Sequence, residues 1–221
     1  MSIPFCLLST HWYGVAAILY GLILAFVVRQ GPWAQLKEHA KLNAYLGTCV
    51  ILMVLWWIKT PLLPGIEYHY LGATLLTLMF GWRLAVMGVS LVLAASTLNG
   101  NADVLSYPLN ALLMGIIPVM VSHWILKVGE RFLPPNFFVY VFLAGYWGSA
   151  LAMISASLAT GAVLWLGGAY SFEVIADRFF PLLFLLAVPE GMITGVLIAM
   201  MAVFRPAWVS TFDDTRYLRG Q

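Results

Sequence analysis

The sequence predicts an all-α, polytopic transmembrane helical bundle of about seven spans, formed as a single domain over residues 1–221. Three observations carry this prediction. Hydrophobic residues make up 62% of the chain and charged residues only 9%, whereas soluble domains carry about a quarter charged residues. The mean hydropathy is +0.93. Finally, the apolar residues are gathered in runs long enough for membrane helices, which need about 20 residues each.

Polar breaks divide the chain into six apolar runs. These are Trp12–Val28, Leu42–Ile58, Leu71–Ser96, Pro108–Leu126, Phe137–Leu166 and Phe179–Phe204. The third run is long for one helix and is interrupted by Gly81-Trp82-Arg83. We therefore expect two short helices there, Tyr70–Phe80 and Leu84–Leu98, that form a wedge at residues 70–98.

Charge placement supports seven crossings, with the N-terminus outside and the C-terminus cytoplasmic. Cytoplasmic loops are enriched in Lys and Arg. With the third run divided, nine basic residues fall inside and two, Lys59 and Arg178, fall outside. A single third span would give a worse split and would leave Arg83 near the bilayer centre, at a cost of roughly 2.5–3.5 kcal/mol. The inside residues are Arg29, Lys37, Lys41, Arg83, Lys127, Arg131, Arg205, Arg216 and Arg219.

The first short helix of the wedge is only about 16 Å long at 1.5 Å per residue. It is too short to cross a bilayer, so we expect neighbouring helices to shield it. In the last run, Gly191 and Gly195 form a GxxxG pair of the kind that lets helices approach closely.

Several potential metal ligands fall on the outer side of this topology. They include Cys6 and His11 before the first span, and Glu67 and His69 before the third. Imidazole, thiolate and carboxylate are ligands of first-row divalent metals. The alternative is structural: His11 and His69 each lie among aromatic residues of the interfacial type, and a lone cysteine is often a small apolar residue.

Glu190 lies near the middle of the last span. A carboxylate at that depth normally faces the bundle interior, either with a function or as a hydrogen-bonded packing group, and both interpretations stay open here. Signatures of hydrolases, zinc proteases and nucleotide-binding loops are absent from the sequence, so we expect no enzyme. The sequence contains no run of Lys and Arg residues, so nothing in it indicates nucleic-acid binding.

Three stretches, taken in order, resemble the CbiM/NikM family, the substrate-capturing membrane components of energy-coupling factor transporters for cobalt and nickel. The first is Glu67–Leu76 followed by Phe80–Trp82. The second is Leu98–Gly115, which contains an Asn-x-x-x-Met-Gly helix start at Asn110. The third is Ala187–Gly195, with a Glu-Gly-x-x-Thr signature. The order and spacing extend from about residue 65 to 206.

The resemblance implies seven helices, an outside N-terminus and His69 as a metal ligand. Asn110 and Glu190 are then the polar side chains expected within the membrane. Family members begin Met-His, and that His helps to form the metal site, whereas this chain has Ser2. His11 or Cys6 is a candidate replacement ligand.

The implied function is uptake of a divalent transition metal, resembling cobalt or nickel, across a prokaryotic cytoplasmic (inner) membrane. The ion would be cargo, with no permanently bound cofactor. The implied partners, beside the lipid bilayer, are a transmembrane coupling subunit and ATPase subunits that supply energy, and 29–41 and 205–221 are the basic segments that they would contact. Two alternatives are a non-transporting membrane chaperone or assembly factor with the same fold and a component that binds an organic substrate.

Overall fold

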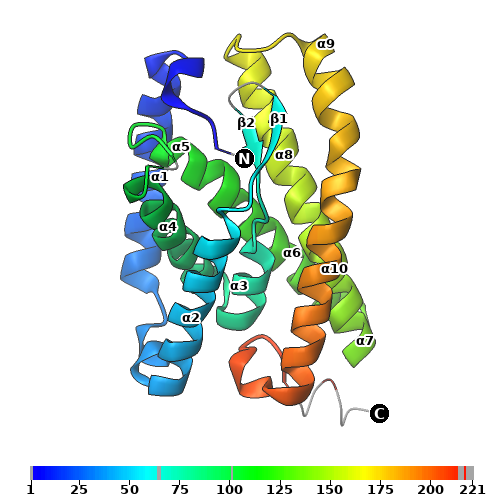
Figure 1. Cartoon of the computed structure of the whole chain (residues 1–221). Helices are drawn as coiled ribbons and strands as arrows, with labels where there is room; N and C mark the ends of the chain where they lie inside the picture. Colours follow the sequence, from blue (N-terminus) through cyan, green and yellow to red (C-terminus); the bar gives the residue numbers. More distant parts are fainter. Residues whose placement is uncertain (1, 64–65, 101, 214–216, 218–221) are drawn as a thin grey trace.

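A computed structural model describes residues 2–63, 66–100, 102–213 and 217, and it confirms the all-α bundle. Seven helical rods follow one another along the described part of the chain (Figure 1). Four of the rods are long and apolar enough to cross a membrane, and two shorter ones are also apolar. Of the basic residues used in the charge count, Arg216 and Arg219 lie outside the described residues. The number of crossings and the side of each terminus stay predictions.

The observed helices follow the predicted runs with shifts at their ends. The first two rods are α1 (Thr10–Gln30) and α2 (His39–Leu55), and the wedge consists of α3 (Ala73–Phe80) and α4 (Trp82–Leu98). The last three rods each contain a π-helical stretch. They are α5 (Tyr107–Asn110), η3 (Ala111–Ile116) and α6 (Ile117–Phe132); α7 (Phe137–Val139), η4 (Tyr140–Trp147) and α8 (Gly148–Leu166); and α9 (Phe172–Val174), η5 (Ile175–Phe179) and α10 (Phe180–Phe204).

Gly81 divides the third apolar run, as the sequence predicts. Its φ of 81° lies in a region that glycine adopts without a steric penalty. The Arg83 guanidinium lies beyond this turn and donates to the Gln30 carbonyl and side-chain oxygens at the end of α1, at 3.0 and 3.1 Å. Two short helices therefore replace one long span, and Arg83 lies beside a helix end.

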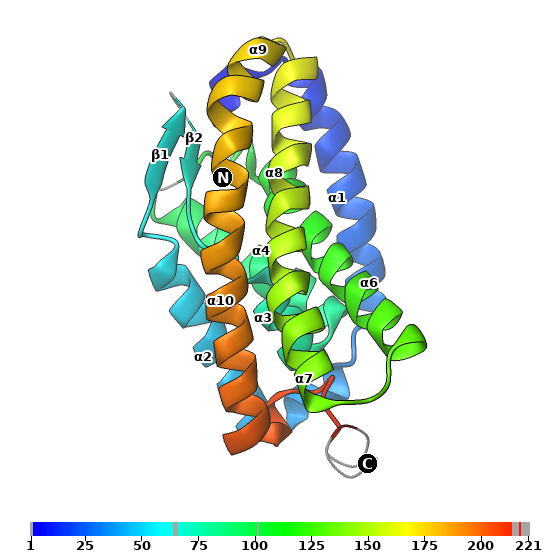
Figure 2. The ribbon, with the colours of Figure 1, turned by 90° about the vertical axis from the view of Figure 1, so that its right-hand side faces the viewer.

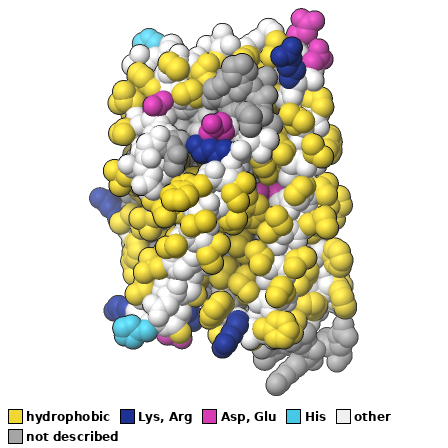
Figure 3. Space-filling view, viewed as in Figure 1, with side chains coloured by type: hydrophobic (Ala, Val, Ile, Leu, Met, Phe, Trp, Pro, Cys, Tyr) yellow, Lys and Arg dark blue, Asp and Glu magenta, His cyan; other side chains and the backbone are white. Residues whose placement is uncertain are grey.

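The short helix α3 lies in the interior of the bundle (Figures 1 and 2). All eight of its residues are buried, which confirms the predicted shielding. Figure 3 shows the opposite character on the outside of the bundle, where hydrophobic side chains cover much of the face and charged ones are few.

The last rod and the segment after it hold both ends of α3. Before α3, the backbone N–H groups of Leu71 and Gly72 donate to the Glu190 carboxylate of α10. In the last turn of α3, the Met79 carbonyl accepts from the Ser210 N–H at 2.8 Å. The Leu78 carbonyl accepts from the Thr211 hydroxyl at 2.7 Å. Helix ends leave carbonyl groups without intrahelical partners, and residues 210–211 satisfy two of them.

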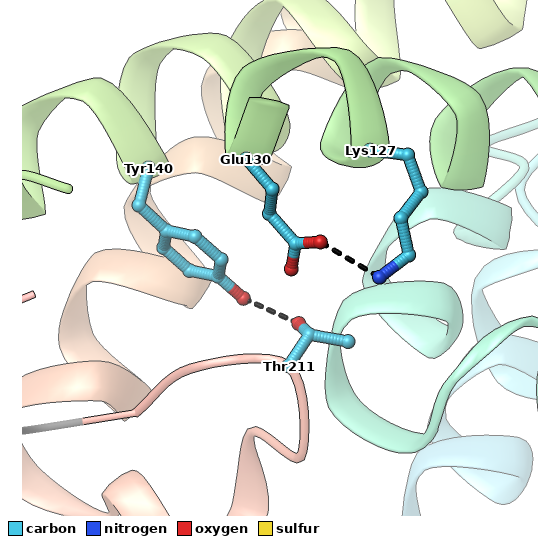
Figure 4. Close-up of polar contacts among 4 residues, drawn as sticks. All are labelled: Lys127, Glu130, Tyr140 and Thr211. Atoms are coloured by element: carbon cyan, nitrogen blue, oxygen red, sulfur yellow. Dashed lines mark hydrogen bonds and ion pairs between the residues drawn. The ribbon is translucent and has the colours of Figure 1, made fainter. Parts of the chain in front are cut away.

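Figure 4 shows a second contact of Thr211, with Tyr140. Its hydroxyl lies 2.6 Å from the Tyr140 hydroxyl at the start of η4. The neighbouring ion pair, Lys127 with Glu130 at 2.7 Å, belongs to the end of α6. The segment after α10 thus ties α3 to η4 beneath the bundle.

The GxxxG pair of α10 makes the close approach expected of it. A Cβ atom built on Gly191 would lie 2.8 Å from the Tyr146 carbonyl oxygen of η4, and one on Gly195 would lie 3.4 Å from the Tyr146 Cβ. Only a residue without a side chain fits at position 191 without a shift of the neighbouring backbone.

A β-hairpin joins α2 to the wedge, and the sequence did not predict it. Strand β1 (Thr60–Leu63) pairs antiparallel with β2 (Ile66–Tyr68). Ser2 adds an isolated bridge to Glu67 on β2. The segment before α1 therefore turns back into the bundle beside β2, as the blue end of the ribbon shows in Figure 1.

Candidate functional site

His69 lies in the short stretch between β2 and α3 and is buried, with 3% of its surface exposed. It lines a small cavity of about 10 Å³ at the point where the N-terminal segment, α2, α4 and η3 meet. This volume is close to the minimum that admits one water molecule. The other lining residues are Ser2, Trp56, Lys59, Leu93, Ser96, Ala102 and Met114.

Asn110 fixes the N-terminal segment beside this cavity. Its side-chain oxygen accepts from the Ile3 N–H at 2.8 Å, and its amide nitrogen donates to the Ile3 carbonyl at 3.1 Å. Both residues are fully buried. The Phe5 N–H donates to the Asp103 carboxylate at 2.9 Å, two residues further along. The structure thus places Asn110 inside the protein, where it pins position 2 beside His69.

The surroundings of His69 favour the neutral ring. Burial lowers the pKa of His69 well below its usual range, and the neutral imidazole is the form that binds metals. Its Nδ1 lies 3.2 Å from the Tyr70 carbonyl oxygen. Because a carbonyl only accepts, this contact assigns the proton to Nδ1.

Glu190 holds the backbone that follows His69. Its two carboxylate oxygens accept from the N–H groups of Leu71 and Gly72, at 3.0 and 2.9 Å. Gly72 has a φ of 67°, a left-handed conformation in which glycine is not strained. The Tyr70 hydroxyl lies 2.7 Å from the Thr194 hydroxyl, one turn further along α10. Of the two interpretations open from the sequence, these contacts favour the hydrogen-bonded packing group, and Glu190 positions the loop that carries His69.

The other two candidate ligands lie elsewhere. Cys6 and His11 are exposed, and neither lines the cavity that contains His69. Within the described ranges, no three His, Cys, Asp or Glu side chains lie close enough to hold a metal ion. The structure therefore brings neither Cys6 nor His11 to His69, and their role as replacement ligands stays a prediction.

Sequence reasoning missed Trp56 and Lys59 as cavity residues. The Trp56 ring lies against the His69 ring, with centroids 4.4 Å apart. Lys59 Nζ forms an ion pair with the Glu67 carboxylate at 2.8 Å. Trp56 lies within the predicted second span, Leu42–Ile58. One signal was available: an apolar run that ends in Trp-Trp-Ile-Lys, separated by seven residues from the His-bearing stretch that begins at Glu67.

Solved structures that are similar to this chain include the following two. One is described as "Crystal Structure of an Truncated Transition metal Transporter", with a TM-score of 0.80 and 20% identity over 92% of this chain and 99% of that one. The other, "Crystal Structure of an transition metal transporter", has a TM-score of 0.80 and 21% identity over 92% of this chain and 93% of that one. At these identities the likeness establishes the fold alone. Among curated proteins, none matches this sequence.

The protein-family comparison covers nearly the whole bundle. The model that describes the cobalt uptake substrate-specific transmembrane region matches residues 3–208, from the pinned N-terminal segment to the turn after α10. This range contains Asn110, His69 and Glu190, the residues that carried the resemblance. The chain therefore belongs to the CbiM family of multi-pass membrane proteins of metal uptake.

Proposed function

We propose that this protein is the substrate-binding membrane component of an energy-coupling factor transporter for a divalent transition metal of the cobalt and nickel kind. One observation carries the proposal most directly. The N-terminal segment is pinned so that position 2 and His69 line one cavity. The family match over residues 3–208 supports uptake of a metal.

In this proposal the metal is cargo and binds His69 through Nε2. Tyr70 and Glu190 orient the ligand: the Tyr70 carbonyl accepts from Nδ1, and Glu190 fixes the two following N–H groups. Hydrogen bonds that orient a metal ligand in this way typically change metal affinity 10–100-fold when they are removed. The protein itself performs no bond chemistry.

Transport needs partners, because the sequence has no nucleotide-binding loop. We infer that a transmembrane coupling subunit and ATPase subunits act on this chain in a prokaryotic inner membrane, with the N-terminus outside. The basic end of the bundle supports this arrangement: Lys127 and Arg131 lie in the last turns of α6, and Arg205 directly follows α10. Positive residues gather on the cytoplasmic side of membrane proteins.

A second function is favoured by one specific observation. Ser2 occupies the position at which the cobalt and nickel proteins resembling this one have a ligating His, and Ser2 lines the cavity. A member that has lost this ligand fits a membrane chaperone or assembly factor that keeps the fold without moving metal.

Metal content separates the two functions. The full-length protein is purified in detergent, loaded with Co, Ni, Cu or Zn, and analysed by mass spectrometry. Near-stoichiometric metal that is lost in His69→Ala and kept in His39→Ala supports metal uptake; the second variant is a matched control because His39 is exposed and is not a candidate ligand. Background metal in the wild type would rule out this function and leave the assembly-factor hypothesis.

A further inference from the structure

Helix α3 is held at both ends by one continuous piece of chain, which consists of α10 and the residues that follow it. At the end nearer the candidate site, the Glu190 carboxylate of α10 accepts from the Leu71 and Gly72 N–H groups. At the other end, residues 210 and 211 donate to the last carbonyls of α3. We call residues 205–213 the strap. Helix α3, the turn before it, α10 and the strap therefore form a closed ring.

The strap is a fixed part of this ring. Its Val209 and Phe212 side chains are buried, and the Phe212 ring packs against the Tyr140 ring of η4, with centroids 5.1 Å apart. Thr211 connects the strap to α3, because its N–H and its hydroxyl both donate to the Leu78 carbonyl, at 3.3 and 2.7 Å. The Thr211 hydroxyl has a single proton, so the Tyr140 hydroxyl, 2.6 Å away, is the donor in their contact. Thr211 thus joins α3 to η4.

Helix α3 can carry a displacement from the strap to the turn that follows His69. Its eight residues form a rod about 12 Å long at 1.5 Å per residue. All eight are buried, and closely packed interiors transmit strain because they contain few voids. The Gly72 carbonyl accepts from the Leu76 N–H at 3.1 Å. The turn that Glu190 holds is therefore bonded directly into the helix, with no free segment between them.

The strap is also the accessible member of the ring. Glu190 is 2% exposed and α3 is buried throughout, whereas Arg205, Ser210 and Asp213 of the strap are exposed. In Figure 1 the strap lies at the lower end of the bundle, which the charge count predicts to be cytoplasmic. A protein that binds at this end can therefore contact the strap.

We propose that Thr211 is a positioning residue for His69. The strap and α3 together transmit movements at the cytoplasmic end of the bundle to the loop that carries His69. This inference deepens the proposed function and rests on it for its role in uptake, because a coupling subunit that shifts the strap would change how the outer site holds its metal. The coupling itself is a property of this chain and is tested without metal.

The test is amide hydrogen exchange of the full-length protein in detergent, read by mass spectrometry of peptides that separate residues 69–72 from 77–81. Thr211→Val keeps the shape of the side chain and removes its hydroxyl, and Thr211→Ser keeps the hydroxyl as the conservative rescue. Thr160→Val is the matched control, because Thr160 is buried in α8 and its hydroxyl donates to the Ala156 carbonyl of the same helix. If Thr211→Val does not fold, Tyr140→Phe replaces it, since this variant removes only the donor to Thr211.

We expect Thr211→Val to speed exchange of the Leu71 and Gly72 N–H groups roughly threefold to tenfold, the value of one hydrogen bond. Thr211→Ser and Thr160→Val should match the wild type. Faster exchange that is confined to residues 77–81, or that is equal throughout the bundle, would overturn the coupling. The metal content of the wild type is measured separately. Its absence would refute the proposed function and the role of the coupling in uptake, whereas the exchange rates would still decide whether the strap and the His69 loop are coupled.

Discussion

Glu190→Gln is expected to destabilise the protein by about 2–3 kcal/mol, because Glu190 holds the turn before α3 with both of its oxygens. The two hydrogen bonds are 3.0 and 2.9 Å long, and a bond to a charged group contributes about 1.5–3 kcal/mol. Glutamine replaces one oxygen by an NH₂ group, which then faces a backbone N–H. One bond is lost, and the other becomes a weaker bond between neutral groups.

An opposite effect sets the lower limit of this estimate. Glutamine avoids the cost of burying a charge, and Glu190 is only 2% exposed. Glu190→Ala avoids the same cost but removes both acceptors, so it should destabilise more than Glu190→Gln. The order of stability is therefore wild type, then Gln, then Ala.

The assay is unfolding of the purified protein in mixed micelles, followed by circular dichroism as the denaturing detergent is increased. Glu38→Gln is the control, because Glu38 pairs with Lys41 at the surface, 58% exposed, and such pairs contribute at most about 1 kcal/mol. Retention of metal should fall in Glu190→Gln as well, since the held turn follows His69 directly. Equal unfolding free energies for Glu190→Gln and Glu38→Gln would refute the reasoning.

Three further substitutions test the site and the packing. Ser2→His should tighten metal binding roughly tenfold, or 1.4 kcal/mol, by adding an imidazole to the cavity. The dissociation constant is measured by competition with a chelating dye, and an unchanged value would contradict the placement of position 2. Gly72→Ala should destabilise by about 1–3 kcal/mol, because φ is 67° there and the added methyl meets a buried leucine. Gly47 lies in open space within α2, so Gly47→Ala should instead stabilise the protein by about 0.5–1 kcal/mol. Equal melting temperatures for Gly72→Ala and Gly47→Ala would show that the turn at Gly72 is not strained. Gly191→Ala should cost about 1–3 kcal/mol, since its methyl would lie 2.8 Å from the Tyr146 carbonyl; a melting temperature equal to that of the wild type would mean that α10 and η4 are less tightly packed.

The helices were predictable from the sequence because each rod is an apolar run long enough to be recognised by composition alone. The division at Gly81 was also predictable, since a glycine beside Arg83 interrupts an apolar run that is otherwise too long. The ends were less accurate. Helix α2 begins at His39 and ends at Leu55, three residues before the predicted bounds at each end, because hydropathy does not register where capping and turns stop a helix.

The hairpin and the inserted N-terminal segment could not be predicted in this way. Strands of four and three residues are too short to show an alternating pattern. The pairing of Ser2 with Glu67, and of Ile3 with Asn110, joins positions far apart in the sequence. The periodicity of hydrophobic residues indicates local secondary structure, and it does not encode contacts between positions so far apart. His69 and Glu190 were identifiable as candidates, but the sequence did not show that Glu190 serves the loop of His69, nor that Trp56 lies against its ring.

The way in which α3 is held has a consequence for synthesis. The carboxylate that receives the Gly72 N–H is made 118 residues later in the chain, and the groups that cover the Leu78 and Met79 carbonyls come later still. At about 5–20 residues per second, a ribosome needs roughly 6–24 s to cover that interval. During this time the backbone groups at the two ends of the short helix lack these partners, and unpaired backbone groups are costly in lipid. The hydrogen bonds at the ends of α3 are therefore completed only after the last helix and the segment that follows it have been made.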